Sequence, residues 1–300
     1  MARIVIIGAS ISGHTAAVSL REQDKDCSIT LLTQDSHPLY DRRKLALLLS
    51  GAIKEEEIFL TSEDSLQKLK IDFLKEKKVV SVNAAKRIVY FKDKDNIEYD
   101  FLVIASGRHP VLPELPGAKK SGVSFLYTLD DYKEFSNRII REPVCLVGSS
   151  QEAVEIAKSI VLKFKAEVKL VSRLTQDTSS LPAEIEVINI PLAEIIGESQ
   201  VQAVKLEDGK AIGVSCVVFV DTFKNNIDFL KNTDIEMHED AVLVDEMMRT
   251  SAERVFACGI VAKGRKAMQA TKTWEDAMSD SLCLAQTLIK QMKGETCQTY

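Results

Sequence analysis

A turn of glycine and serine near the start of this 300-residue sequence has the composition of a phosphate-binding site. Gly8, Ser10 and Gly13 follow an apolar run in a G-x-S-x-x-G pattern. In the related G-x-G-x-x-G pattern, the first glycine permits a tight turn and the second lets the backbone approach a pyrophosphate. The third lets the helix and the strand pack closely. The helix that follows would offer its N-terminal N–H groups to phosphate, including those of Ile11 and Ser12.

A second turn of the same kind lies 140 residues further along the chain. Gly148 and Ser150 occupy its first two positions and Ala153 occupies the third, so two of the three glycines of a complete motif are absent. Glu152, near the expected start of the helix, would repel a phosphate. Two dinucleotide-type turns predict two nucleotide sites, or one site and one relic.

The elements that must position these turns follow from the apolar pattern. Runs at 4–7, 29–32 and 168–172 have the composition of buried parallel strands. Small and apolar residues at helical spacing follow each turn. Strand, turn, helix and strand, occurring twice, predict an α/β fold with two Rossmann-like dinucleotide-binding domains.

Composition excludes several classes of partner. The net charge of −5 argues against nucleic-acid binding, which depends on a basic field. No apolar run reaches the roughly 18 residues of a membrane span, and the first residues lack the pattern of an export signal. We therefore expect a cytoplasmic protein with no nucleic-acid partner and no membrane span.

The six cysteines contain no CxxC pair. This spacing excludes a redox-active dithiol and a paired-CxxC zinc site, so we expect reduced thiols and no metal site. Cys258, between Ala257 and Gly259, is expected to be a small core residue rather than a redox thiol.

Five motifs in order resemble the FAD-dependent pyridine nucleotide-disulfide oxidoreductase family. Within it, the rubredoxin, ferredoxin and nitrite reductase flavoproteins are nearest in pattern. The motifs are the turn at 8–13, Tyr40-x-Arg42-x-x-Leu45, the run at 99–107, the second turn at 148–153, and the stretch 244–259. The resemblance implies that the second domain is inserted in the first. An FAD-binding segment would span 1–110, a NAD(P)-binding-like domain with a degenerate motif 111–228, and a second FAD-binding segment 229–300.

The resemblance also implies a set of FAD contacts beyond the first turn. Gln34 or Asp35 would reach the adenosine ribose, Arg42 would lie near phosphate or flavin, and Lys44 would lie near the isoalloxazine. The remaining contacts would come from Val79, Ala105, Ser106, Gly107, Arg108, Gly259, Ile260 and Trp274. Trp274 begins a helical stripe at 277, 278, 282, 285, 288 and 289 that core packing explains as well as cofactor contact does. No catalytic side chain is expected, because the flavin carries the chemistry.

Two departures from the family pattern bear on the cofactors. The family has aspartate after the last glycine, but this chain has Ile260, which removes one charge-assisted hydrogen bond worth about 1.5–3 kcal/mol. At the second turn, Gly148, Ser150, Glu155 and Arg173 are the candidate NAD(P) contacts. Arg173 stands near the position where an acidic residue would hold the ribose of NAD. It would either hold the 2′-phosphate of NADPH or be a solvated strand end.

The later Gly-x-x-Pro-Asn motif of the family also departs from its pattern. It is replaced by the run 222–226, which has neither the glycine nor the proline. FAD is therefore the expected cofactor, and NAD(P)H is the weaker expectation.

Three functions are consistent with these residues. The first is an FAD-containing oxidoreductase moving electrons between NAD(P)H and an iron–sulfur or other redox protein, such as a ferredoxin or rubredoxin. The second is an FAD-binding electron-transfer subunit of a larger complex that does not bind NAD(P)H. The third is a structural or regulatory relative without catalysis. Family members carry a further C-terminal interface domain of roughly 80–100 residues. We expect this chain to lack that domain, and therefore expect an oligomer or hetero-complex in which a partner covers the flavin.

Overall fold

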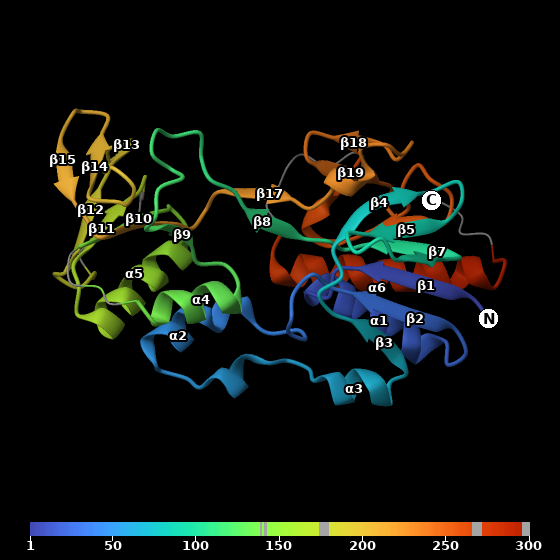
Figure 1. The fold of residues 1–300 in the computed structure, drawn as a ribbon. Helices are drawn as coiled ribbons and strands as arrows, with labels where there is room; N and C mark the ends of the chain where they lie inside the picture. Colours follow the sequence, from blue (N-terminus) through green and yellow to red (C-terminus); the bar gives the residue numbers. More distant parts are fainter. Residues whose placement is uncertain (139, 141–142, 174–179, 266–271, 296–300) are drawn as a thin grey trace. The chain divides into compact units, whose positions relative to one another are not determined.

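In the computed structural model, residues 1–138, 140, 143–173, 180–265 and 272–295 are described. The chain forms two compact units. Unit 1 comprises residues 1–40, 59–108 and 224–300, and unit 2 comprises residues 41–58 and 109–223. Each unit is built on its own five-stranded parallel sheet (Figure 1).

The sheet of unit 1 has the strand order β20-β7-β1-β2-β3, and every neighbouring pair is parallel. Its strands are β1 (Arg3–Ile7), β2 (Ser28–Leu32), β3 (Ile71–Leu74), β7 (Phe101–Ile104) and β20 (Val255–Ala257). These strands are almost entirely apolar because both faces of the sheet are covered.

Alternate residues of β1 serve the two faces of this sheet. Ile4 and Ile6 pack in a core with α1 (Ile11–Gln23) and α6 (Trp274–Met292), which lie side by side. Val5 and Ile7 face the opposite core. Two small sheets supply that core, β4-β5-β6 and β18-β19-β21. Their strands are β4 (Val79–Asn83), β5 (Ile88–Phe91), β6 (Asn96–Glu98), β18 (Met237–His238), β19 (Ala241–Val244) and β21 (Ala262–Gly264).

Three short helices complete unit 1. They are α3 (Glu63–Lys68) and the 3₁₀ turns η3 (Asp228–Leu230) and η4 (Gly259–Val261). The turn η4 follows β20 after one residue, Cys258, and begins at the last glycine of the fifth motif.

The sheet of unit 2 has the strand order β12-β11-β10-β16-β9, again with parallel neighbours. Its strands are β9 (Val123–Phe125), β10 (Val144–Val147), β11 (Val168–Val171), β12 (Ile185–Ile188) and β16 (Cys216–Phe219). The helices of this unit are α2 (Leu45–Ser50), α4 (Leu129–Ser136) and α5 (Gln151–Phe164), with 3₁₀ turns η1 (Arg42–Lys44) and η2 (Glu55–Ile58). An antiparallel sheet of β13 (Leu192–Ile196), β14 (Ala203–Leu206) and β15 (Ala211–Gly213) supplies further core residues.

Residues 41–58 pack with unit 2, although they fall inside the segment 1–110 that the sequence assigns to the first domain. The reason is α2, whose Leu45, Ala46 and Leu49 are buried and which packs against α4 and α5. The chain passes between the two units at β8 (Arg108–Pro110) and β17 (Phe223–Asn225), which pair with each other.

The predicted α/β fold with two Rossmann-like units is confirmed. The β1–α1–β2 unit recurs as β10–α5–β11, with Ile4 opposite Ile29 in one sheet and Val144 opposite Val168 in the other. In the described part of the chain, no helix is both long and apolar enough to cross a bilayer.

The predicted apolar stripe of α6 is wrong at two positions. Met278 and Leu282 are 37% and 45% exposed. The other four predicted positions, Ala277, Ala285, Leu288 and Ile289, are buried, and the buried face also contains Ser281, Leu284 and Thr287. Spacings of three and four residues keep positions 277, 281, 284 and 288 on one side of the helix.

Candidate functional site

Three turns of unit 1 meet at the N-terminal end of α1. Gly8 follows β1 with φ of +107°, and its N–H donates to Leu32 O at 2.8 Å. A Cβ on Gly8 would overlap the carbonyl of Ala105 at the end of β7. Only glycine combines this backbone angle with so close an approach of two chain segments.

Gly13 brings α1 against the end of β1. A Cβ on Gly13 would overlap the carbonyl oxygen of Gly8 and would lie 3.3 Å from Ile6 Cγ2. The geometry matches the close packing of helix and strand that the third position of the motif requires.

Gly259 forms the third turn, at the end of β20. Its φ is +72°, and a Cβ there would overlap the side chain of Ser12 on α1. Since β20, β7 and β1 are parallel neighbours, their C-terminal ends lie at one edge of the sheet. The predicted cofactor residues of all three turns are therefore brought together.

The N-terminus of α1 has N–H groups available to a ligand. Ser10 has extended geometry and makes no side-chain cap hydrogen bond, and the first turn contains no acidic residue. The N–H of His14 donates to Ser10 O, so the N–H groups of Ile11 to Gly13 precede the intrahelical series. These groups and the helix dipole fit a phosphate.

Asn226 holds the turn that follows β7. Ser106 Oγ donates to Asn226 O at 2.5 Å, Asn226 Nδ2 donates to Ser106 O at 2.9 Å, and Asn226 N–H donates to Gly107 O at 2.9 Å. Gly107 has φ of +67° and open space where a Cβ would stand. The sequence did not identify this role, because the two partners are 120 residues apart.

Lys272 and Asp280 hold the Gly259 turn, a pairing that sequence reasoning also missed. Asp280 Oδ2 accepts the Gly259 N–H at 3.3 Å and the Lys272 ammonium at 2.5 Å. Lys272 Nζ also donates to Gly259 O at 3.1 Å. Asp280 lies on α6 outside any recognised motif, so no sequence signal marked it.

Ile260 offers no hydrogen-bond acceptor from its side chain, and it is half-buried. It packs against the core that contains Val242, Val244 and Val261. An isoleucine at this position therefore contributes to packing in unit 1.

The predicted ribose and adenine contacts lie on other elements of unit 1. Gln34 is exposed beyond the end of β2. The carboxylate of Asp35 accepts from His37 N–H and from Tyr40 Oη, at 3.1 and 3.2 Å. Val79 is the first residue of β4 and is half-buried. The structure thus gives Asp35 internal partners and leaves Gln34 exposed.

Two predicted basic contacts belong to unit 2. The Arg42 guanidinium lies 4.4 Å from the centre of the Tyr127 ring, and Lys44 Nζ donates to Glu57 O at 3.1 Å. Arg108 begins β8, and Trp274 is the first residue of α6 and is half-buried.

The second turn, in unit 2, is occupied by the protein itself. Asp221 Oδ2 accepts the N–H groups of Ser149 and Ser150, and Asp221 Oδ1 accepts the Ser150 hydroxyl. Ser150 Oγ in turn accepts the Ala153 N–H. A pyrophosphate would meet a carboxylate here, so these residues do not fit a dinucleotide in the way that the α1 turn does.

The other candidate NAD(P) contacts lie around the same turn. Gly148 follows β10, and a Cβ on it would lie 3.1 Å from Asp221 Oδ2. Glu155 is exposed on α5. Arg173 has an exposed side chain, and its N–H donates to Ser149 Oγ at 2.9 Å.

The prediction that Cys258 is a core residue is confirmed. It is 1% exposed, and burial raises the pKa of its thiol to about 12. The thiolate is therefore absent at neutral pH, so the residue is inert. The five cysteines of the described part are free thiols.

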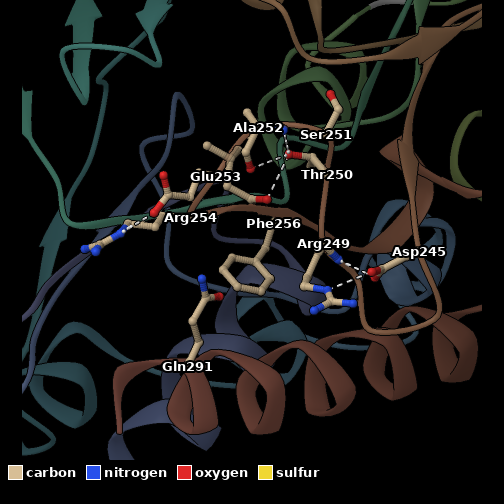
Figure 2. A pocket seen from close by; sticks show the side chains of 10 residues that line it. Asp245, Arg249, Thr250, Ser251, Ala252, Glu253, Arg254, Phe256 and Gln291 are labelled. Carbon is tan, nitrogen blue, oxygen red and sulfur yellow. Dashed lines mark hydrogen bonds and ion pairs between the residues drawn. The ribbon is translucent and has the colours of Figure 1, made fainter. Parts of the chain in front are cut away.

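A shallow pocket of about 400 Å³ lies at the 245–256 turn (Figure 2). Its charged groups are paired with one another: Arg249 Nε lies 2.7 Å from Asp245 Oδ2, and Arg254 Nε lies 3.3 Å from Glu253 Oε1. Asp245 Oδ1 also accepts the Arg249 N–H. These bonds explain the 245–254 part of the fifth motif as a structural turn.

The profile of the pyridine nucleotide-disulphide oxidoreductase family matches residues 2–280. An NADH oxidase of Methanocaldococcus jannaschii is 29% identical over 86% of this chain and 62% of its own length. The epsilon subunit of an NADH-dependent phenylglyoxylate dehydrogenase of Aromatoleum evansii is 25% identical over 98% of this chain and 73% of its own. The rubredoxin-NAD(+) reductase of Pseudomonas putida is 24% identical over 97% and 80%.

Solved structures show the same fold. The putidaredoxin reductase–putidaredoxin complex matches with a TM-score of 0.86 at 18% identity, over 100% of this chain and 77% of the matched chain. The NADH:rubredoxin oxidoreductase of Clostridium acetobutylicum matches with a TM-score of 0.77 at 21% identity, over 100% and 77%. Both similarities support the two Rossmann-like units described above.

Proposed function

The chain belongs to the pyridine nucleotide-disulphide oxidoreductase family of FAD-dependent enzymes, and we propose that its flavin exchanges electrons with a redox protein. The observation that carries this proposal is the meeting of the Gly8, Gly107 and Gly259 turns at the open N-terminus of α1. Members of the family bind FAD and NAD(P)H.

In this proposal, unit 1 residues hold the FAD. Gly8, Ser10, Ile11, Ser12 and Gly13 bind the pyrophosphate through backbone N–H groups and the helix dipole. The remaining contacts in unit 1 are Gln34, Asp35, Val79, Ala105, Ser106, Gly107, Arg108, Gly259, Ile260 and Trp274. We assign FAD binding to the parts of segments 1–110 and 229–300 that belong to unit 1, and a nucleotide-like fold without an established ligand to 111–228.

The isoalloxazine supplies hydride and single-electron chemistry when bound. The chain's own residues bind and orient it. Asn226 fixes the Ser106–Gly107 turn, and Asp280 with Lys272 fixes the Gly259 turn. No side chain is required to act as acid, base or nucleophile.

We propose an iron–sulfur or related electron carrier as the partner. Relatives named as rubredoxin-NAD(+) reductase and NADH-rubredoxin oxidoreductase support a small carrier protein. The relative named as a dehydrogenase subunit supports assembly into a larger complex. The second turn, in unit 2, holds the Asp221 carboxylate. This carboxylate favours electron exchange that does not pass through NAD(P)H bound to this chain.

A second candidate is direct oxidation of NAD(P)H, as the names of several relatives specify for those proteins. It differs from the first in the source of electrons only. Both candidates predict bound FAD, so FAD binding tests them together. The electron donor that reduces the flavin separates them.

The test begins with FAD binding, measured by visible absorbance and by calorimetric titration of the apoprotein. Ser10→Asp places a carboxylate at the proposed pyrophosphate position and should weaken FAD binding at least about tenfold, because like charges repel. Ser65→Asp, at an exposed position of α3, adds the same charge elsewhere and should leave FAD affinity unchanged. Equal affinity of both variants would contradict the proposed site.

Electron transfer is then measured anaerobically. Reduced ferredoxin or rubredoxin should bleach the flavin band of the holoprotein, and bleaching by NADH or NADPH would instead support the second candidate. A chain that takes up no FAD would refute both.

A further inference from the structure

We infer that Asp221 closes the second nucleotide site: its carboxylate occupies the anion position at the N-terminus of α5 and excludes the pyrophosphate of NAD(P)H from unit 2. The inference rests on the proposed function in one respect, because it specifies which molecule is not the electron donor at this chain.

The sheet of unit 2 aims Asp221 at this turn. Strand β16 runs parallel to β10, with Phe219 opposite Val147. Val220 N–H donates to Val147 O at 3.0 Å, which extends the pairing past the end of β16. The next residue, Asp221, therefore stands beside the two residues that follow Gly148.

The carboxylate of Asp221 takes three donors of the turn. Asp221 Oδ2 accepts from Ser149 N–H at 2.5 Å and from Ser150 N–H at 2.9 Å, and Oδ1 accepts from Ser150 Oγ at 2.7 Å. Backbone N–H groups of such a strand-to-helix turn are the groups that hold phosphate in dinucleotide sites. They are therefore already satisfied by an internal anion.

Unit 1 provides an internal comparison at the same sheet position. Ile104 of β7 stands opposite Ile7, as Phe219 stands opposite Val147. Two residues later the chain has Ser106 in unit 1 and Asp221 in unit 2. Ser106 Oγ is directed to Asn226 O rather than to the α1 turn, so a neutral residue in one unit corresponds to a bound carboxylate in the other.

Charge adds to this steric occupation. Besides Asp221, the site has Glu152 in the first turn of α5. The first turn of α1 has no acidic residue. A diphosphate entering unit 2 would displace Asp221 from its three hydrogen bonds and lie close to two carboxylates. Juxtaposed like charges strongly disfavour binding.

The internal comparison also selects the variant. Asp221→Ser gives unit 2 the residue type that unit 1 has at this position. Asp208→Ser is the matched control, because Asp208 lies in an exposed turn of the same unit and its removal changes the net charge equally. ADP-ribose is the probe, since it carries the pyrophosphate and both riboses but cannot reduce flavin.

Isothermal titration of the FAD-loaded protein measures ADP-ribose binding. We expect no saturable binding to the parent protein or to Asp208→Ser. Asp221→Ser should bind ADP-ribose saturably, at least about tenfold more tightly than the weakest affinity that the titration resolves. Saturable binding to the parent protein, or an Asp221→Ser variant that matches Asp208→Ser, would overturn the inference.

Thermal unfolding establishes that both variants are folded. FAD content is determined on the same samples, so failure of the proposed flavin function is recorded separately from the ADP-ribose result. If Asp221→Ser does not fold, Asp221→Asn serves in its place. It keeps the size and one acceptor of the side chain, removes the charge, and should bind ADP-ribose more tightly than Asp208→Asn.

Discussion

Asp280 on α6 and Lys272, which precedes the helix, support the Gly259 turn at the place where the family pattern has an aspartate next to the glycine. The side chains are 17% and 22% exposed. Their ion pair also engages both the N–H and the carbonyl of Gly259. The chain therefore keeps a carboxylate at this turn, but the carboxylate acts on the backbone.

Asp280→Asn should loosen the Gly259 turn. It removes the charge from hydrogen bonds with Lys272 and Gly259, which are worth about 1.5–3 kcal/mol together in stability. We expect urea unfolding to show a loss in that range and FAD affinity to fall. Asp72→Asn, at an exposed strand position of unit 1, is the control; an equal effect of both variants would contradict the role of Asp280.

His14 should make stability depend on pH. Burial lowers its pKa below the ordinary value of 6.5, so the unfolded chain binds a proton more readily than the folded one. The contribution of neutral His14 is fully present above pH 6.5 and is lost as the pH falls below it. His14→Gln should flatten the acid side of the free energy of unfolding against pH. An unchanged slope would show that His14 does not titrate in this way.

At the scale of elements, α6 shows how tertiary packing chooses a face. Leu284 is fully buried against the sheet of unit 1, while Leu282, two residues earlier, is 45% exposed. The sequence offers apolar residues on both sides of this helix. Which side of α6 faces α1 and is buried depends on where the chain places this helix against the sheet.

These two leucines form a matched pair for a stability measurement. Leu284→Ala should destabilise the protein by about 2–5 kcal/mol, because it leaves a cavity in the core. Leu282→Ala should change the free energy of unfolding by no more than about 0.5 kcal/mol. Equal losses in denaturant titrations would contradict the assignment of the buried face.

At the scale of the whole molecule, the two units carry the same strand–turn–helix–strand motif with opposite states of the anion position. The α1 turn has no acidic residue in its first turn, and the α5 turn holds the Asp221 carboxylate. A chain with a duplicated nucleotide fold is thus expected to take one nucleotide.

Ligand-dependent stability tests this asymmetry. FAD at about 100 times its dissociation constant should stabilise the apoprotein by about 2.7 kcal/mol. ADP-ribose at millimolar concentration should leave the unfolding midpoint unchanged in the presence of saturating FAD. Stabilisation of the FAD-loaded protein by ADP-ribose would show that the second unit also binds a nucleotide.

The sequence by itself determined the fold class and the residues of the α1 turn. Apolar strands followed by small-residue turns leave few alternatives to a dinucleotide-binding fold. In the structure, the glycines at 8 and 13 meet backbone atoms that leave no space for a side chain. It also indicated that the second turn is degenerate, because missing glycines are visible in the sequence alone.

Only the tertiary structure decided what fills the second turn and what holds the first. Asp221 is 71 residues from Ser150, Asn226 is 120 residues from Ser106, and Asp280 is 21 residues from Gly259. Each pair meets because neighbouring parallel strands, or a helix packed beside them, bring distant segments to one edge of a sheet. A local sequence pattern carries no record of such a meeting, since the pattern fixes the periodicity of an element but not its neighbours in space.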